Sequence, residues 1–429
     1  MLGGGTFTSQ NKKLPGAYIN FASAQKASST IGERGIAAIA LELDWGKDEE
    51  IISVTSEEFA KNSISLFGYD YADDKLKGLR DLFKNITKAY LFKLNKGEKA
   101  TNDIATALCS GVRGNELKIV IQKNVDDQTK YDVSTYLGTR EVDKQTVEKA
   151  SELVANKFVT FKGTTLEITA GKALTGGSNG TVSGDAHQNF LDKLESYKCN
   201  AIGCLSEESS VSGLYVEYAK RLRDKLGIKL QVVVYNNAAD YEGAVNVKNT
   251  AEESKTAVVY WVTGVIAGCE INKSNTNKTY DGEFTIVADY TQAQLESAID
   301  AGEFILHKVG DEVRVLVDIN SLVTTTEEKG EDFKSNQTIR VLDQIATDVS
   351  SVFNTKYLGK IANNESGRTS LWNDVATLFK EYQQIQAIEN FEDTDITVAI
   401  GNNKKSVTID SAVQIINAME KLYMTVVVE

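Results

Sequence analysis

An alternation of helical and strand patterns between residues 187 and 324 constrains the fold of this chain more than any other feature of its sequence. An amphipathic stretch at 190–197 precedes an apolar run at 200–205, and a second amphipathic stretch at 214–226 precedes an apolar run at 229–235. Helices and short apolar strands that alternate at this spacing are typical of parallel βαβ units. We therefore expect an α/β domain with helices packed on a parallel sheet.

The region upstream predicts a smaller α/β unit. Strand patterns at 36–42, 51–54 and 89–94 flank two helical patterns, and Thr55 stands three residues before Glu58. A Thr followed three residues later by Glu is a capping box, in which each side chain accepts the backbone N–H of the other residue. The first helix of this unit is therefore expected to begin directly after Thr55.

A strand-rich module is expected between these two α/β regions. Its strand patterns lie at 117–123, 131–136, 158–161 and 166–169, and one helical pattern lies at 146–155. The glycine-rich run at 175–180 marks its end.

The C-terminal region combines two helical patterns with a hairpin. Apolar residues recur every three or four positions over 339–353 and 369–385, and alternating residues at 396–400 and 407–409 flank a Gly-Asn-Asn turn. A short helix at 418–423 is expected to lead into an apolar strand at 424–429. A terminal apolar strand requires another strand to pair with.

Together these patterns predict an α/β (α+β multidomain) chain. Its mixed-sheet core domains carry a strand-rich inserted module and extended N- and C-terminal arms. A length of 429 residues, 41 % of them hydrophobic, suffices for several buried cores. The expected parts are an N-terminal arm (1–30), a small α/β domain (31–95), the strand-rich insert (96–178), an α/β domain with βαβ units (179–330), a C-terminal α/β domain (331–421) and a C-terminal arm strand (422–429).

Charge and hydropathy argue against nucleic acid and membrane partners. The chain carries 47 basic and 60 acidic residues, a formal net charge of −13, and no dense basic run. Phosphate binding needs clustered Lys and Arg, so no nucleic-acid partner is expected. The apolar run at 257–269 is far shorter than the roughly 20 residues of a membrane span, so no direct membrane insertion is expected. Its Gly264-Val265-Ile266-Ala267-Gly268 pattern predicts close helix packing in a core.

No catalytic, cofactor-binding or metal-binding residue stands out. The four cysteines lack metal-ligand spacing and are expected to be buried free thiols, and the two histidines, His187 and His307, have no nucleophile beside them in sequence. The glycine-rich runs at 3–5 and 175–180 match neither the dinucleotide-binding nor the phosphate-loop spacing. The N-terminus lacks the basic and apolar regions of a signal peptide.

Several dispersed stretches resemble the tail sheath proteins of contractile phage tails and tailocins, in particular the branch with PBSX-like particles and diffocins. These stretches cover nearly the whole chain. They are Leu174-Thr175-Gly176-Gly177, Gly180, Ala267-Gly268, 274–276, Asp318-Ile319-Asn320, Arg340-Val341-Leu342-Asp343, Tyr357-Leu358-Gly359-Lys360, Asp395-Ile396 and 417–425.

The resemblance implies a structural subunit that polymerises as stacked hexameric rings around an inner tube. Such a sheath contracts from a metastable extended state and drives the tube through a target cell envelope, with no cofactor. The implied partners are further copies of the chain, the inner tail tube protein, and baseplate and tail terminator proteins. Assembly would take place in the bacterial cytoplasm, and lysis would release the phage tail or tailocin particle.

The resemblance also implies that both termini are assembly arms which add strands to the sheets of neighbouring subunits, the binding mode called β-augmentation. A frayed terminus is the alternative interpretation of the N-terminal segment. The residues expected to form the arms are Tyr18, Ile19, Phe21, Thr425, Val426, Val427 and Val428.

A tube-facing surface is expected on the helix at 369–388 or on the loop before it. Arg368 and Lys380 are the residues expected to contact an acidic tube, although each could also be an ordinary solvated charge. Two other function classes stay open at this point: an α/β enzyme that binds a metabolite or nucleotide at the strand ends of residues 200–320, and an adhesin or surface-layer module.

Overall fold

A computed structural model describes residues 4–5, 17–18, 32–163 and 165–428 of the chain. It contains two compact units. The larger, here called the sheet unit, comprises residues 32–347 and 415–428, and the smaller, the hairpin unit, is built mainly from residues 348–414. Two short strands near the N-terminus, β1 (Gly4–Gly5) and β2 (Ala17–Tyr18), pair in parallel.

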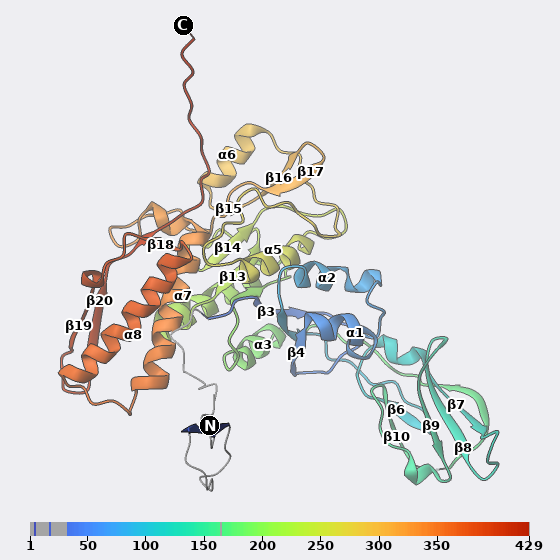
Figure 1. Cartoon of the computed structure of the whole chain (residues 1–429). Helices are drawn as coiled ribbons and strands as arrows, with labels where there is room; N and C mark the ends of the chain where they lie inside the picture. The colour runs from blue at the N-terminus through green and yellow to red at the C-terminus, as the bar shows by residue number, and fades with distance from the viewer. Residues whose placement is uncertain (1–3, 6–16, 19–31, 164, 429) are drawn as a thin grey trace. The chain divides into compact units, whose positions relative to one another are not determined.

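A seven-stranded mixed sheet forms the centre of the sheet unit (Figure 1). Every neighbouring pair is parallel except β4 with β5, which confirms the predicted βαβ alternation and the α/β class. In spatial order the strands are β15 (Glu303–Phe304), β14 (Ala244–Val247), β13 (Gln231–Tyr235), β12 (Ala201–Gly203), β3 (Ile36–Leu41), β5 (Lys88–Lys93) and β4 (Ile51–Thr55).

Helices cover both faces of this sheet. Strand β3 shows why the sheet needs two layers: Ala37 and Ile39 enter one core, whereas Ala38 and Ala40 enter the other. Alternate residues of a strand point to opposite faces, so a strand that is apolar on both sides must be covered on both sides. One core contains α1 (Ser56–Phe67), α2 (Lys77–Phe83) and α5 (Ala257–Gly268), and the other contains α3 (Ala186–Leu194) and α4 (Ser209–Lys220).

Local sequence signals place two of these helices. Thr55 caps α1 and forms the predicted capping box with Glu58. The glycines of α5 allow close packing against α2, since a Cβ on Gly264 would lie 2.6 Å from the carbonyl oxygen of Leu82. Helix α5 is therefore a core helix, as the Gly264–Gly268 pattern predicts. Among the described residues, no helix is long and apolar enough to span a membrane.

The strand-rich region follows β5. Its four-stranded sheet has the order β11 (Thr169–Ala173), β7 (Leu117–Lys123), β8 (Tyr131–Leu137), β9 (Arg140–Val147), and β6 (Ala105–Ala107) pairs with β10 (Val159–Phe161). The helix predicted at 146–155 is wrong. Residues up to Val147 pair with β8 instead, and only a single 3-10 turn, Ala150–Glu152, follows. Pairing with β8 accounts for Thr146 and Val147, and residues 153–155 form neither helix nor strand.

The two predicted C-terminal helices and the hairpin are present with shifted ends. Helix α7 (Asn336–Val352) contains the boundary between the two units, and a π turn, Phe353–Tyr357, follows it. The hairpin unit contains α8 (Glu365–Gln384) and the predicted hairpin of β19 (Ile396–Ile400) and β20 (Val407–Ser411). The other elements are α6 (Gln292–Asp300), β16 (Leu306–Val309), β17 (Glu312–Val315), β18 (Ile388–Glu389) and β21 (Gln414–Ile415).

Residues 416–428 form neither helix nor strand. The short helix predicted at 418–423 is therefore wrong. An isolated helix of this length is unstable unless one face packs against a core, and the side chains of Met419, Leu422 and Tyr423 are exposed. The strand predicted from residue 424 onward has no partner strand among the described residues.

Candidate functional site

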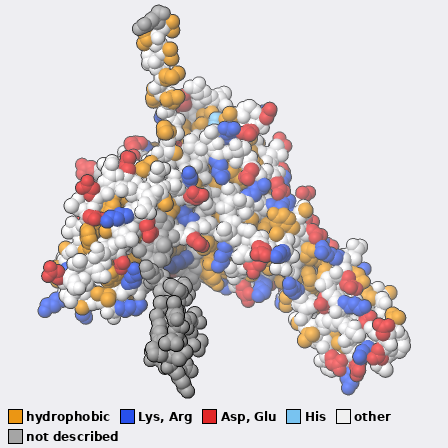
Figure 2. Space-filling view, viewed as in Figure 1, with side chains coloured by type: hydrophobic (Ala, Val, Ile, Leu, Met, Phe, Trp, Pro, Cys, Tyr) orange, Lys and Arg blue, Asp and Glu red, His pale blue; other side chains and the backbone are white. Residues whose placement is uncertain are grey.

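The C-terminal arm, residues 422–428, is a continuous exposed apolar segment. Its hydrophobic side chains are between 70 % exposed at Val426 and 90 % exposed at Val428. Figure 2 shows these side chains in orange along the projecting C-terminal segment. A contiguous row of exposed apolar side chains typically marks an interaction surface, because water contact with that area is unfavourable.

Hydrogen bonds hold the arm root, residues 416–420, against the sheet unit. The Gln337 side chain donates to the carbonyl of Ile416 at 3.1 Å and accepts the N–H of Ala418 at 3.0 Å. The Thr338 hydroxyl donates to Asn417 Oδ1 at 3.3 Å. A fourth contact joins Thr276 Oγ1 to the Glu420 carboxylate at 2.8 Å. The arm therefore leaves the domain from a fixed point.

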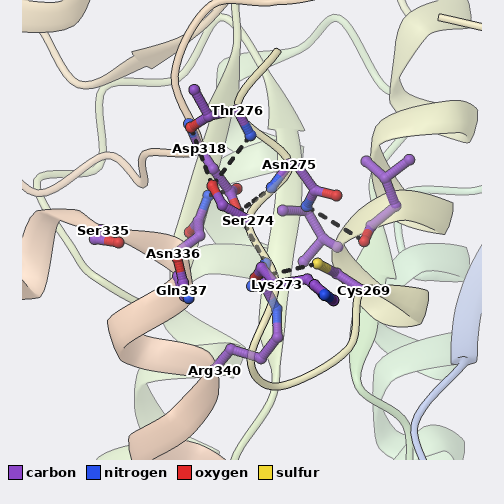
Figure 3. A network of polar contacts seen from close by, with 12 residues as sticks. Cys269, Lys273, Ser274, Asn275, Thr276, Asp318, Ser335, Asn336, Gln337 and Arg340 are labelled. Carbon is purple, nitrogen blue, oxygen red and sulfur yellow. Dashed lines mark hydrogen bonds and ion pairs between the residues drawn. The ribbon is translucent and has the colours of Figure 1, made fainter. Parts of the chain in front are cut away.

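A buried polar network lies around the start of α7, beside this root (Figure 3). Asp318 is its centre: its carboxylate accepts the backbone N–H of Asn275 at 2.9 Å, Asn336 Nδ2 at 3.0 Å and Arg340 Nη2 at 3.0 Å. Its own N–H donates to Thr276 Oγ1 at 3.0 Å. The network thus connects three chain segments to the residue that also bonds Glu420.

The two charged residues of this network are buried, so its hydrogen bonds matter for the stability of the sheet unit. The side chains of Arg340 and Asp318 are 0 % and 1 % exposed, so both charges are removed from water. Such a pair is tolerable only when further hydrogen bonds satisfy its polar atoms. Arg340 also donates to the carbonyl of Lys273 at 2.7 Å. Removing one member would leave the other buried without its ion-pair partner.

A second buried ion pair fastens α7 to the sheet unit. Asp343, about one turn after Arg340, accepts two hydrogen bonds from Arg223, at 2.5 and 2.8 Å. Arg223 also donates to the carbonyl of Leu230, next to β13. Further along, Gln344 donates to the carbonyl of Gly32, the first described residue after the N-terminal segment, at 3.4 Å. Helix α7 therefore contacts the chain near both termini.

Four of the stretches that carry the family resemblance meet at this place. Residues 274–276, 318–320, 340–343 and 417–420 are far apart in sequence, yet each contributes to the network or to the arm root. Sequence reasoning missed Gln337 and Thr338. Both are buried polar residues of α7, and a helical pattern read from apolar positions carries no signal for them.

The predicted tube-facing residues lie on α8 in the hairpin unit. Lys380 forms an exposed ion pair with Asp393 at 2.7 Å, and Arg368 donates to Asn363 Oδ1 at 3.1 Å. Arg368 also lines a surface pocket with Ile361, Lys405 and other residues. Neither contact tests the tube prediction. Of the predicted arm residues, Tyr18 ends β2, Ile19 and Phe21 lie outside the described residues, and Thr425–Val428 lie in the exposed arm.

The cysteine thiols and His187 are mostly buried or hydrogen-bonded within the fold. Cys109, Cys199 and Cys204 are buried, as predicted, while Cys269 is partly exposed. Burial raises the pKa of the Cys199 thiol to about 12, so it stays protonated at neutral pH. His187 Nδ1 lies 2.9 Å from the Tyr215 hydroxyl, and burial lowers its pKa. Within the described ranges, no cluster of His, Cys, Asp and Glu could hold a metal ion.

Family models match consecutive parts of the chain, and each model describes a part of a phage tail sheath protein. They are the tail sheath protein Gp18 domain III N-terminal region (34–94), the phage tail sheath protein beta-sandwich domain (95–179), the phage tail sheath protein central domain (180–321) and the phage tail sheath C-terminal domain (328–429).

Individual proteins agree with these matches. The phage-like element PBSX protein XkdK of Bacillus subtilis (strain 168) is 32 % identical, over 99 % of this chain and 99 % of that protein. The crystal structure of the sheath tail protein from Desulfitobacterium hafniense is similar with a TM-score of 0.82 and 36 % identity, over 95 % of this chain and 99 % of that one. The helical sheath of the anti-feeding prophage in its contracted state shares the fold, with a TM-score of 0.56 at 10 % identity, over 97 % and 99 % of the two chains.

Proposed function

Because this chain belongs to the phage tail sheath protein family, whose members are structural proteins and not enzymes, we propose that it is the subunit of a contractile tail sheath. Its copies polymerise as stacked hexameric rings around an inner tube. The sheath forms in a metastable extended state and then contracts, which drives the tube through a target envelope. Family membership sets aside the enzyme alternative.

The observation that carries this proposal is the exposed C-terminal arm. It is apolar over residues 422–428, has no partner strand among the described residues, and is held at its root. An apolar segment without a partner gains hydrogen bonds and burial when it joins a sheet of another molecule as an added strand. Identical subunits joined by such head-to-tail contacts form helical polymers rather than closed dimers.

The β19–β20 hairpin is the sheet proposed to receive the arm of a neighbouring subunit. It contains two strands paired over five residue pairs, from Ile396 with Ser411 to Ile400 with Val407. Two-stranded sheets are marginal on their own, and each strand leaves one edge open to a further strand. Helix α8 packs beside β19, where Trp372 Nε1 donates to the carbonyl of Ile396 at 3.0 Å. Added strands would extend this sheet.

The N-terminal arm is proposed to act in the same way through Tyr18, Ile19 and Phe21. The further partners proposed are the inner tail tube protein and the baseplate and tail terminator proteins. A sheath with this role would assemble in the bacterial cytoplasm and leave the cell by lysis as part of a phage tail or a tailocin. The net charge of −13 supports the absence of a nucleic-acid partner. The energy for contraction would be stored in packing between subunits, behind a kinetic barrier.

Negative-stain electron microscopy of the purified chain, with and without its candidate tube protein, tests the proposed function. The expected result is long hollow cylinders with six-fold end views, at least when the tube is present. A chain that stays monomeric in both preparations would contradict the sheath role.

Charge reversal tests the tube-facing residues. The double variant Arg368→Glu, Lys380→Glu is expected to abolish tube-dependent assembly, because a change of four charge units on α8 would repel an acidic tube. The matched control is Lys61→Glu, Arg140→Glu, which makes the same charge change at two exposed, ion-paired residues of the sheet unit. Equal assembly of the two double variants, scored by pelleting with the tube, would rule out this assignment.

A further inference from the structure

We infer that Gln337 is a positioning residue that fixes the direction in which the C-terminal arm leaves the subunit. This inference rests on the proposed function of the arm. It assigns to one side chain on α7 the task of holding the arm root in an extended form, ready for a neighbouring sheet.

The geometry of the Gln337 amide supports this role. In a parallel ladder, a residue opposite position i donates to the carbonyl of i−1 and accepts the N–H of i+1. The Gln337 side chain makes the same two bonds around Asn417: it donates to the carbonyl of Ile416 at 3.1 Å and accepts the N–H of Ala418 at 3.0 Å. One side-chain amide therefore takes the place of a peptide group in a neighbouring strand.

The Gln337 amide is itself held firmly. Gln337 is only 3 % exposed, and the next residue, Thr338, is 2 % exposed. The preceding residue, Asn336, donates to Asp318 at 3.0 Å and accepts from Gln231 at 2.8 Å. Buried hydrogen bonds thus fix the first turn of α7 within the sheet unit. Gln337 and Thr338, here called the clamp, therefore keep their positions when the arm moves.

The clamp ends abruptly at Glu420. Its carboxylate accepts from Thr276 Oγ1 at 2.8 Å, whereas no residue of the described segment 421–428 makes a hydrogen bond or ion pair. The pivot of the arm therefore lies at Lys421. Without the bonds from Gln337 and Thr338, residues 416–420 would add to the length of chain that nothing holds, and the longer tether would lower the effective concentration of the arm at a neighbour.

Trypsin cleavage after Lys421 reports on the clamp in the full-length monomer, before any assembly. Proteolysis requires the chain around the cleaved bond to be released, so held residues slow it. Lys404 and Lys405 in the exposed β19–β20 turn serve as the internal reference. Gln337→Ala is expected to raise the ratio of cleavage after Lys421 to cleavage after Lys404 and Lys405 by about tenfold, the combined weight of two lost hydrogen bonds.

Conservative variants guard against a general loss of structure. Thr338→Val keeps the shape of the side chain and removes only its bond to Asn417, so it is expected to raise the same cleavage ratio by about threefold. Gln344→Ala is the matched control: it is a buried glutamine of the same helix that contacts the carbonyl of Gly32 instead. It is expected to leave cleavage after Lys421 unchanged.

Assembly provides the second readout. Gln337→Ala is expected to raise the protein concentration needed for polymerisation on the tube by about tenfold, the same factor as the expected rise in the cleavage ratio, because both report release of the arm root. An unchanged cleavage ratio in both Gln337→Ala and Thr338→Val would overturn the clamp. A raised ratio with wild-type polymerisation would overturn its positioning role. Failure of the wild-type chain to polymerise would contradict the proposed function, and the cleavage ratio of the monomer would still decide the clamp.

Discussion

Truncation of the chain after Lys421 is expected to abolish polymerisation and to leave the isolated subunit folded. The removed side chains are 70 to 90 % exposed where they are hydrophobic, and none bonds to the rest of the described chain. The melting temperature of the monomer should therefore shift by no more than about 1 °C, since exposed residues contribute little to stability. In a polymer the same residues would supply the intersubunit strand, so their loss removes the main contact.

A length-matched control separates the effect of the apolar sequence of the arm from the effect of its length. Replacing residues 422–428 with a glycine and serine segment keeps the reach of the arm but removes its apolar side chains and its strand propensity. This variant is also expected to stay monomeric in negative-stain images. Normal sheaths from either variant would contradict the assignment of residues 422–428 as an assembly arm.

The substitution Asp318→Ala is expected to lower the free energy of unfolding of the sheet unit by about 3–5 kcal/mol. It leaves the Arg340 guanidinium buried without its ion-pair partner, and a buried charge that loses its partner is strongly destabilising. It also removes the acceptor of the Asn275 and Asn336 hydrogen bonds. Urea unfolding followed by tryptophan fluorescence measures the effect, because Trp45 and Trp261 are both buried in this unit.

Two control variants make this prediction specific. Glu57→Ala breaks an ion pair with Lys61 whose two side chains are more than two-thirds exposed, and is expected to cost at most about 0.5 kcal/mol. The double variant Asp318→Leu, Arg340→Met removes both charges and should recover part of the loss. A cost for Asp318→Ala as small as that for Glu57→Ala would show that the network does not hold α7.

The parts of the fold that sequence predicts well are those set by local patterns. The Thr55 capping box, the alternation of helix and strand around β12 and β13, and the β19–β20 hairpin each follow from a short periodic pattern with clear end signals. In such segments the local preference and the tertiary structure agree, which is the condition for reliable prediction.

The errors fall where long-range contacts decide. Thr146 and Val147, where the predicted helix begins, instead end β9 and pair with β8. Residues 418–423 lack the packing surface that a short helix needs. The buried polar network joins Asn275, Asp318 and Arg340, which are separated by 43 and 22 residues. No local pattern indicates which polar side chains will meet in a core, and only the family resemblance pointed to these stretches.

A cryo-electron microscopy reconstruction of the wild-type polymer would show whether each subunit gives its C-terminal arm to the sheet of another copy. The predicted result is a strand of residues 422–428 from one subunit paired to an edge of the β19–β20 hairpin of its neighbour. A polymer in which residues 422–428 contact no other subunit, or in which both hairpin edges stay unpaired, would contradict the proposed donation of the arm to a neighbouring hairpin.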